Sequence, residues 1–296
     1  MRHITVLQNE AVLELALNAS SLVVDATLGS GGHSRAILEK LGKTGTYIGM
    51  DADQSAIDSA KDWIEKYNAE SHLVHANFKN IDAVIKDLNL QCVDAILADL
   101  GWRIEQFEDS GKGFSFNSDD PLLMTFGNPA DYAFTAGDIV NEWDEQDIAN
   151  VIYGYGGERF SRRIAKAIVE YRKKQKIETA KELSEIVRNS TPSFYRKGKV
   201  NPATKTFQGL RIAVNDELSV LEEFIEKAFE ALCPKGRLAI ISFHSLEDKI
   251  VKECFKSYAR DQVGLLVNKK PIIPTEEELR ANPRSRSAKL RIIEKL

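Results

Sequence analysis

The sequence has no long hydrophobic run, few cysteines and no leader-like start. None of its apolar stretches approaches the roughly 20 residues that a membrane span needs. The first residues, Met1–Val6, do not have the charged and then apolar pattern of a secretory signal. The three cysteines, Cys92, Cys233 and Cys254, are far apart and fit no zinc-binding spacing. We therefore expect reduced thiols, no metal, no membrane contact and a cytoplasmic protein.

The composition is that of a globular protein, but its charge is unevenly distributed. Of 296 residues, 43% are hydrophobic and 28% are charged, and the formal net charge is −4. Residues 105–150 hold eleven acidic side chains against one basic, whereas residues 158–211 hold fifteen basic against five acidic. Residues 279–296 add six basic side chains against one acidic. Such local positive fields attract a polyanion even when the total charge is negative, although many of these side chains are expected to be solvated helix faces.

Short apolar strands alternate with amphipathic helices in the first hundred residues. This alternation predicts a mostly parallel sheet with helices on both of its faces. The predicted strands cover residues 22–27, 46–51, 72–75 and 93–99, and the helices cover residues 33–41, 54–67 and 81–88.

After residue 100, a loop and a series of helices interrupt the alternation of strands and helices, which resumes near residue 236. Residues 101–131 are rich in Gly, Ser, Asp, Asn and Pro and predict a long ordered loop. Helices are then expected at 144–153, 158–174 and 179–189, with a longer one after Pro202 towards Leu232. A strand at 236–242, a helix at 246–257 and a closing strand at 288–293 follow. We interpret this as one α/β domain (1–103 and 205–296) interrupted by an inserted loop and helical domain (104–204) that recognises the substrate.

Candidate ligand-binding residues fall where the predicted strands end. The first strand ends at Asp25 and leads into the glycine-rich turn 29–32, where a ligand can approach the backbone. Asp51 ends the second strand, where a carboxylate can bind both hydroxyls of a ribose, and Asp99 ends the fourth. A dinucleotide site uses the same plan, but its third glycine would be needed at Ser34. The pattern thus favours a methyl donor over a nicotinamide cofactor.

The chain resembles, over essentially its whole length, the bacterial small-subunit ribosomal RNA cytosine methyltransferases of the RsmH (MraW) type. Many separate stretches match in the right order, which is far more specific than any single motif. The matching stretches are His3–Leu7, Asp25–Ser34, Asp99–Gly101, Gly113–Phe116, Tyr155–Gly156, Pro202–Gln208, Leu210–Ile212, Ile241–Asp248 and Asn282–Ser287.

The resemblance implies a Rossmann-like class I methyltransferase domain with an inserted helical domain. Members of this family use S-adenosylmethionine to methylate the 4-amino group of a cytidine in the decoding region of 16S rRNA. The small ribosomal subunit is therefore the expected partner. The donor-binding positions that the resemblance carries over are Gly31, Gly32, His33, Asp51, Phe78, Asp99 and Gln106.

Several positions depart from the family pattern. Arg103 and Ile104 stand where the family usually has two serines. Leu123 and Thr125 replace an acidic residue and an arginine in the stretch that follows. Most of these departures cluster in the loop expected to cover the target base, and the donor positions are unaffected.

Methyl transfer to a cytosine needs acceptors that hold the N–H bonds of its poorly nucleophilic amino group. Asp99 and the Leu100 carbonyl are the candidates, although Asp99 alternatively only orients the donor or caps the loop. Trp102 is a candidate platform on which the base stacks, or else anchors the loop. His244 is expected to face the same crevice, and Ser245 is equally consistent with an ordinary helix N-cap.

Phosphate contacts are expected from basic side chains. Arg159, Arg162, Arg163 and Lys166 have a spacing that would gather them on one helical face. Arg196, Lys197, Lys199, Arg284 and Arg286 are expected to join them. Two other functions remain open from the sequence: an RNA- or ribosome-binding assembly factor that keeps the donor fold with weak or lost catalysis, and a nicotinamide-dependent oxidoreductase.

Overall fold

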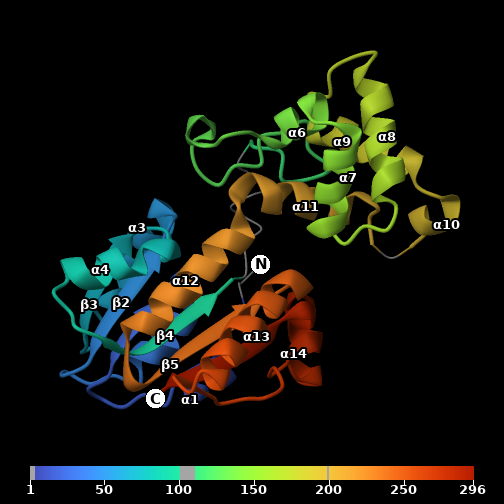
Figure 1. Cartoon of the computed structure of the whole chain (residues 1–296). Coiled ribbons are helices and arrows are strands. Elements are labelled where there is room, and N and C mark those ends of the chain that lie inside the picture. Colours follow the sequence, from blue (N-terminus) through green and yellow to red (C-terminus); the bar gives the residue numbers. More distant parts are fainter. Residues whose placement is uncertain (1–3, 101–110, 199) are drawn as a thin grey trace. The chain divides into compact units, whose positions relative to one another are not determined.

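The computed structural model describes residues 4–100, 111–198 and 200–296, and the chain forms two compact units (Figure 1). The first unit comprises Met1–Gly101 and Leu218–Leu296, and the second comprises Trp102–Glu217. From the sequence, the first domain is predicted to resume at residue 205. In the structure, the second unit continues to Glu217. The helix α11 (Ala203–Asn215) therefore belongs to the inserted unit.

A seven-stranded sheet forms the centre of the first unit. Its strand order is β3-β2-β1-β4-β5-β7-β6. The first five strands of the chain run parallel, while β7 runs antiparallel to both β5 and β6. The predicted, mostly parallel α/β sheet is thus confirmed, and β6 is an additional short strand. The strands are β1 (Leu22–Asp25), β2 (Thr46–Asp51), β3 (Glu70–His75), β4 (Val93–Asp99), β5 (Leu232–Ser242), β6 (Gly264–Leu266) and β7 (Lys289–Lys295).

Helices cover both faces of this sheet because its strands alternate apolar side chains between the faces. On β1, Val23 packs into the core under α1, α2 and α3, whereas Val24 packs into the core under α4, α12 and α13. The helices of this unit are α1 (Gln8–Glu14), α2 (Gly32–Leu38), α3 (Gln54–Ile64), α4 (Ile81–Asp87), α12 (Glu217–Ala231), α13 (Ser245–Arg260) and α14 (Glu276–Ala281), with 3-10 turns at Phe78–Asn80 and Pro283–Ser287.

The second unit is helical and has a core of its own. Thr135 and Thr179 begin two of its helices with capping boxes, in which the Thr side chain and an acidic side chain three residues later satisfy each other's backbone N–H groups. Besides α11, its helices are α6 (Ala136–Glu142), α7 (Glu145–Gly154), α8 (Ser161–Arg172), α9 (Ala180–Ser190) and α10 (Ser193–Arg196), with a 3-10 turn at Pro129–Asp131.

The single long helix expected after Pro202 is wrong, because the structure has two helices there. Asp216 has a φ of 47° and separates α11 from α12. An aspartate tolerates this left-handed conformation better than most residues do, so a continuous apolar pattern conceals the break.

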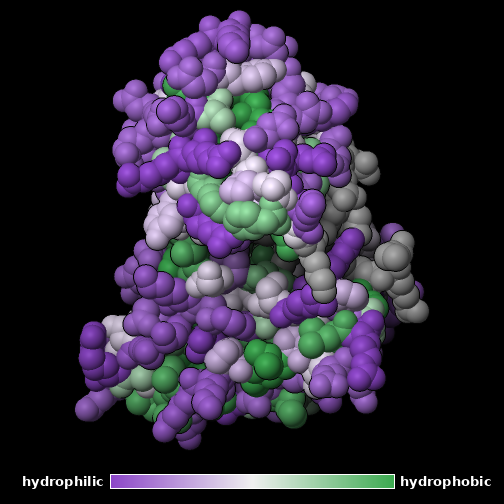
Figure 2. Space-filling model, turned by 90° about the vertical axis from the view of Figure 1, so that its right-hand side faces the viewer, coloured by the Kyte–Doolittle hydropathy of each residue, from purple (hydrophilic) through white to green (hydrophobic). Residues whose placement is uncertain are grey.

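On the face shown in Figure 2, hydrophilic residues predominate and hydrophobic residues gather only in small patches. In the described ranges, no helix has both the length and the apolar character required for crossing a bilayer.

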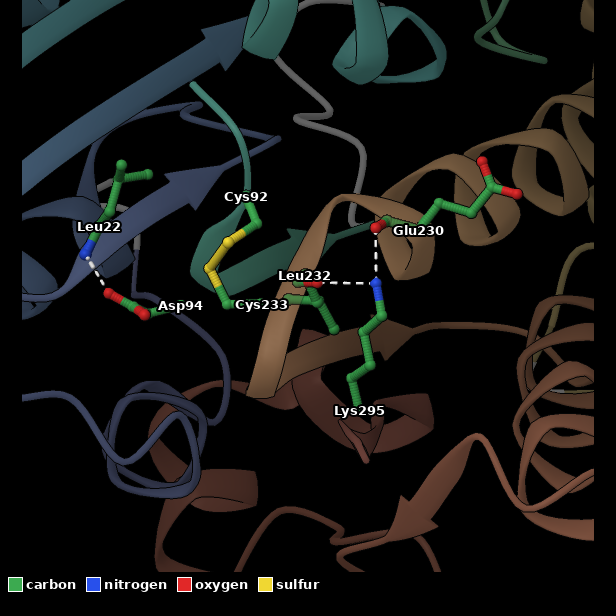
Figure 3. The surroundings of a disulfide bond; sticks show 7 residues. All are labelled: Leu22, Cys92, Asp94, Glu230, Leu232, Cys233 and Lys295. Atoms are coloured by element: carbon green, nitrogen blue, oxygen red, sulfur yellow. Dashed lines mark hydrogen bonds between the residues drawn. A yellow bond between two sulfur atoms is a disulfide. The ribbon is translucent and has the colours of Figure 1, made fainter. Parts of the chain in front are cut away.

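The expectation of reduced thiols is wrong for two of the three cysteines, since Cys92 and Cys233 form a disulfide (Figure 3). They lie 141 residues apart in the sequence, but β4 and β5 are neighbours, and Val93 pairs with Leu232 in their register. The two cysteines flank this pair, so their Cα atoms are 4.9 Å apart. Spacing along the chain could not reveal this proximity, which depends on the order of the strands.

Polar contacts accompany the disulfide at the amino edge of the sheet. The Leu22 N–H donates to Asp94 Oδ2 at 2.8 Å, which links β1 to β4. Lys295 Nζ donates to the carbonyls of Glu230 and Leu232, both at 2.7 Å (Figure 3). This edge is thus held by one covalent and several polar links.

We expect Cys92→Ser to lower the free energy of unfolding by about 2–4 kcal/mol in the absence of reductant, because the disulfide restricts the unfolded chain. With dithiothreitol present, wild type and variant should unfold at the same guanidinium concentration. Cys254→Ser is the matched control and should behave as wild type in both conditions. Equal stability of wild type and Cys92→Ser without reductant would contradict a formed disulfide.

A buried ion pair fixes α13 against β7. Asp248 Oδ1 lies 2.7 Å from Arg291 Nε, and Asp248 Oδ2 lies 2.8 Å from Lys289 Nζ. Burial raises the pKa of Asp248, but the hydrogen bonds from Arg291 and Lys289 outweigh burial and leave that pKa below its usual value. The contribution to stability is therefore present above the unfolded-state pKa of about 3.9 and is lost as the pH falls through the folded-state value.

We expect Asp248→Asn to lower the free energy of unfolding at pH 7 by about 3–5 kcal/mol, because Arg291 would stay buried without its counter-charge. The difference from wild type should shrink below about pH 4, where Asp248 becomes protonated first in the unfolded chain and then, at lower pH, in the folded protein. Denaturant unfolding between pH 3 and pH 7 measures this. Asp58→Asn, which removes an exposed carboxylate paired with Lys61, is the control and should change little. A constant difference at every pH would exclude the ionised pair as the cause.

Candidate functional site

The strand order places a crevice-forming switch point between β1 and β4. From β1 the sheet continues through β2 and β3 on one side, and from β4 through β5 on the other. In open α/β sheets, ligands bind beyond the carboxyl ends of the strands at such a point. Asp25 and Asp99 end these two central strands, and Asp51 ends β2. The three carboxylates singled out from the sequence therefore lie along one edge of the sheet.

In the turn after β1, packing against other protein atoms requires glycine at two positions, which the sequence did not reveal. Gly31 has a φ of 75°, and a Cβ there would lie 2.3 Å from a ring carbon of Trp63. At Gly32 a Cβ would lie 1.7 Å from Thr5 Oγ1. Only at Gly29, with a φ of 53°, would a Cβ meet nothing closer than the Thr27 carbonyl at 3.8 Å. Close approach of a ligand to the backbone thus explains a glycine only at Gly29, whereas protein atoms require it at Gly31 and Gly32.

Asp25 is a buried carboxylate, only 1% exposed, that holds this turn in place. It accepts hydrogen bonds from Ser34 Oγ at 2.7 Å, from the Thr27 N–H at 3.2 Å and from the Tyr47 hydroxyl at 3.5 Å. Burial raises the pKa of Asp25, and the interaction with His33 opposes that increase. Ser34, interpreted from the sequence only as a missing glycine, is therefore the partner of a buried acid.

Asp51 organises the next part of the edge. Its Oδ2 accepts the Gly29 N–H at 2.7 Å, and its Oδ1 accepts the Asp53 N–H at 2.8 Å. Phe78 follows β3 in a 3-10 turn, is half-buried, and packs edge-on against Phe224 with 5.0 Å between ring centroids. Asp51 thus ends β2, and Phe78 follows the neighbouring strand β3, an arrangement compatible with a ribose carboxylate and an adenine contact.

Asp99 lies at the end of β4 beside His33. Its N–H donates to Thr27 Oγ1 at 2.7 Å, and its Oδ2 lies 3.4 Å from His33 Nε2. The side chain of His33 is 6% exposed and that of Asp99 is 18% exposed. Leu100 follows directly, and its N–H donates to the Ile241 carbonyl at 2.9 Å. At the switch point, the partly exposed carboxylate of Asp99 is therefore contacted by the buried imidazole of His33.

His244 begins α13, and it is the N-cap residue in place of Ser245, which is the first residue of the helix. Its Nδ1 accepts the Glu247 N–H at 3.3 Å, and its Nε2 lies 3.1 Å from Glu247 Oε1. Glu247 and Asp248 are in the first turn of this helix. The imidazole thus serves the helix start. His244 and Ser245 also line a cavity of about 250 Å³ together with Phe243, Ile273, Pro274, Leu279, Arg286, Ser287, Ala288 and Lys289.

Two site candidates predicted from the sequence, Trp102 and Gln106, lie outside the described residues, and so do Arg103 and Ile104, two of the departures from the family pattern. Lys199 lies outside them as well. Thr125 is described and fully buried, and its hydroxyl donates to the Gly127 carbonyl at 3.2 Å. This departure from the family pattern is therefore part of the packing of the second unit.

The donor set at the edge of the first unit fits S-adenosylmethionine. Asp51 offers carboxylate oxygens at the end of β2 for a ribose, Phe78 offers a half-buried ring, and the turn is open at Gly29. The resemblance also assigns the donor to Asp51 and Phe78. Thr27, Ser34 and Tyr47 hydrogen-bond to Asp25, and Thr27 also to Asp99, a role that the sequence alone did not indicate for any of the three. A serine or threonine within two or three residues of a glycine turn could have pointed to Thr27 and Ser34, whereas no such signal marks Tyr47.

The basic face predicted in the second unit is only partly correct. The helix α8 begins at Ser161, so Arg159 precedes it and instead lies over the rings of Phe160 and Tyr195, at 4.8 and 5.3 Å. Arg162, Arg163 and Lys166 are exposed on α8, and no salt bridge involves them in the described ranges. Phe194, which Arg159 also approaches at 5.8 Å, is 64% exposed. This unit therefore presents exposed cations and an exposed aromatic ring.

The comparisons with known proteins cover the whole chain. The model of the MraW methylase family matches residues 1–296. A protein from Brevibacillus brevis named ribosomal RNA small subunit methyltransferase H is 44% identical over 99% of this chain and 98% of its own length. A protein of the same name from Synechococcus elongatus is 46% identical over 99% of this chain and 95% of its own.

Among solved structures, an rRNA methylase from Streptococcus thermophilus aligns with 98% of this chain and 95% of its own, with a TM-score of 0.44 and 14% identity. The sequence relatives carry the assignment, since their identity extends through both units and both edges of the sheet. The chain belongs to the MraW methylase family.

Proposed function

We propose that this protein transfers the methyl group of S-adenosylmethionine to the 4-amino group of a cytidine in the decoding region of 16S rRNA. The observation that carries the proposal is the full-length match to a methylase family whose relatives are named small-subunit rRNA methyltransferases. The row of Asp25, Asp51 and Asp99 at the carboxyl edge supports it. Its partner is then the small ribosomal subunit, which places the protein in the cytoplasm.

The donor is held, in this proposal, by the residues that end the first four strands. Asp51 binds the ribose hydroxyls, and Phe78 lies beside the adenine. The backbone of Gly31, Gly32 and His33, together with Asp99 and Gln106, holds the remainder of the donor. When bound, the donor supplies an electrophilic methyl group on a sulfonium, which needs no metal for its transfer.

The chain's own part in the chemistry is to orient the acceptor amine. A cytosine amino group is a weak nucleophile because its lone pair is delocalised into the ring. The Asp99 carboxylate and the Leu100 carbonyl accept its N–H bonds and so favour the form whose lone pair points at the methyl. Trp102 provides the surface on which the extruded base stacks. His244 contributes the opposite side of the acceptor site.

The second unit binds the RNA through its exposed cations. Arg162, Arg163 and Lys166 contact phosphates, while Arg159 and Phe194 offer planar groups to unpaired bases. Phosphate contacts position a structured substrate without reading its sequence, so the assembled subunit is preferred over a short oligonucleotide.

The test is methyl transfer from labelled S-adenosylmethionine to small subunits from cells that lack the endogenous enzyme, followed by nucleoside analysis. We expect the label in 4-methylated cytidine and none with Asp99→Ala. Donor binding without transfer would favour the alternative of a ribosome-binding assembly factor. Binding of a nicotinamide cofactor in place of the donor would favour an oxidoreductase.

Reversal of charge on α8 should weaken binding to the subunit without affecting the donor. For Arg162→Glu combined with Arg163→Glu, we expect the log–log slope of affinity against salt concentration to fall by about one unit for each phosphate that the variant no longer neutralises. Titration of labelled small subunits at several salt concentrations measures this slope. Lys173→Glu, beyond the end of α8 and paired with Glu170, is the control and should keep the wild-type slope. An unchanged slope in the double variant would exclude this helix from the RNA interface.

A further inference from the structure

The imidazole of His33 is buried and has no hydrogen-bond partner within the part of the chain that the structure describes. Its side chain is 6% exposed, and neither Nδ1 nor Nε2 makes a hydrogen bond with any residue that the structure describes. A buried polar group without a partner costs free energy, and native structures keep few of them. An apolar side chain would fill this place without that cost, so packing alone does not account for a histidine here.

Two carboxylates interact with this imidazole. Asp99, on β4, has its Oδ2 3.4 Å from His33 Nε2, a contact that is slightly too long for a good hydrogen bond. Asp25, on β1, interacts with His33 electrostatically, and this interaction lowers the pKa of Asp25. Tyr47, on β2, points its hydroxyl at Asp25, and Arg35, on the same helix as His33, is directed to the carbonyls of Ser30 and Gly31.

The buried position of the His33 imidazole suits a side chain that acts on the acceptor indirectly, through its contact with Asp99. Catalytic hydrogen bonds are often long in the absence of ligand and shorten in the reacting complex. Asp99 is the more exposed of the two side chains, at 18%, and lies at the switch point where the acceptor is expected. Burial raises the pKa of Asp25, and the interaction with His33 opposes this, so a positive charge on His33 and a negative charge on Asp25 would stabilise each other.

We propose that His33 is a positioning residue that orients the Asp99 carboxylate towards the acceptor amine and takes up, through Asp99, the proton that this amine loses. This inference rests on the proposed function, since it needs an amine as acceptor. It gives the histidine of the glycine turn a role in the acceptor chemistry, separate from the contacts of that turn with the donor.

The transfer conserves atoms and electrons. The amine nitrogen forms a bond to the methyl carbon with its lone pair, while the bond from that carbon to the sulfonium sulfur breaks and its electron pair stays on sulfur. The nitrogen then carries a positive charge and loses one proton to an Asp99 oxygen. The proton moves on to His33 Nε2, which leaves Asp99 ionised between the imidazolium and the product. After the product departs, His33 returns the proton to water by way of Asp99.

The first test is the single-turnover rate of methyl transfer to small subunits between pH 6 and pH 9. For His33→Asn we expect a rate about 100-fold below wild type near pH 7, with the deficit shrinking as the pH rises, because hydroxide can then take the proton. Donor affinity, measured by calorimetry, should stay within about threefold because the backbone of the turn is kept. His72→Asn is the matched control, since His72 lies on β3 and contacts Glu70.

The outcomes separate a positioning role from a structural one. A rate that falls by the same factor at every pH, or that does not fall, overturns the proposal. Should His33→Asn melt well below wild type by circular dichroism, His33→Gln is used in its place under the same criteria.

A second measurement does not depend on catalysis. Selective ¹⁵N labelling of the five histidines allows the ring signals of His33 to be assigned by their disappearance in His33→Asn. Asp99→Asn should shift the His33 ring signals and leave those of His72 unchanged. If His33 does not respond, the pairing is overturned even where methyl transfer is observed. If wild type transfers no methyl group but His33 responds, the proposed function fails while the pairing stands.

Discussion

A single buried carboxylate, Asp25, determines the geometry of the site. A charge or potential charge at 1% exposure is tolerated only when its oxygens are hydrogen-bonded. Its three donors come from three different segments: the Thr27 N–H from the turn, Ser34 Oγ from α2, and the Tyr47 hydroxyl from β2. Satisfying Asp25 therefore fixes the start of α2 relative to two strands. The orientation of His33, and with it the contact to Asp99, depends on that constraint.

The two edges of the sheet differ in one respect, the polar satisfaction of a buried histidine. At the amino edge, the Cys92–Cys233 disulfide and the contacts of Asp94 and Lys295 tie neighbouring segments together through satisfied polar groups. At the carboxyl edge, neither ring nitrogen of His33 has a hydrogen-bond partner among the described residues, and Nε2 lies 3.4 Å from Asp99 Oδ2. Reactive groups must be held firmly by residues that do not react. The unsatisfied imidazole therefore lies at the edge where, in the proposed function, the substrate binds.

The parts of this protein that could be predicted from sequence are those governed by short-range periodicity. The parallel strands followed from apolar runs, and the carboxylates of Asp25, Asp51 and Asp99 followed from strand ends, because both depend on neighbouring residues. The disulfide, the break at Asp216 and the N-cap at His244 depended on strand order or on single backbone angles, which no pattern encodes. The count of basic residues in the C-terminal segment also overestimated the positive charge available to a polyanion. Lys289 and Arg291 bind Asp248 there, and Lys295 binds backbone carbonyls.

Lys289, Arg291 and Lys295 bind groups of the protein itself, so recognition of a substrate depends on cations elsewhere. Phosphate-binding cations position a nucleic acid without identifying a base. In the proposed function, the exposed cations of α8 in the second unit are of this kind, so they would select a shape and a charge density. Identity of the base would then be read where its edge meets fixed acceptors, and we propose Asp99 and the Leu100 carbonyl as these acceptors. An amino group satisfies both, whereas the carbonyl of a uracil at the same place would face a carboxylate and be repelled. In the proposed reaction, discrimination for cytosine would therefore follow from the same carboxylate that we propose His33 orients.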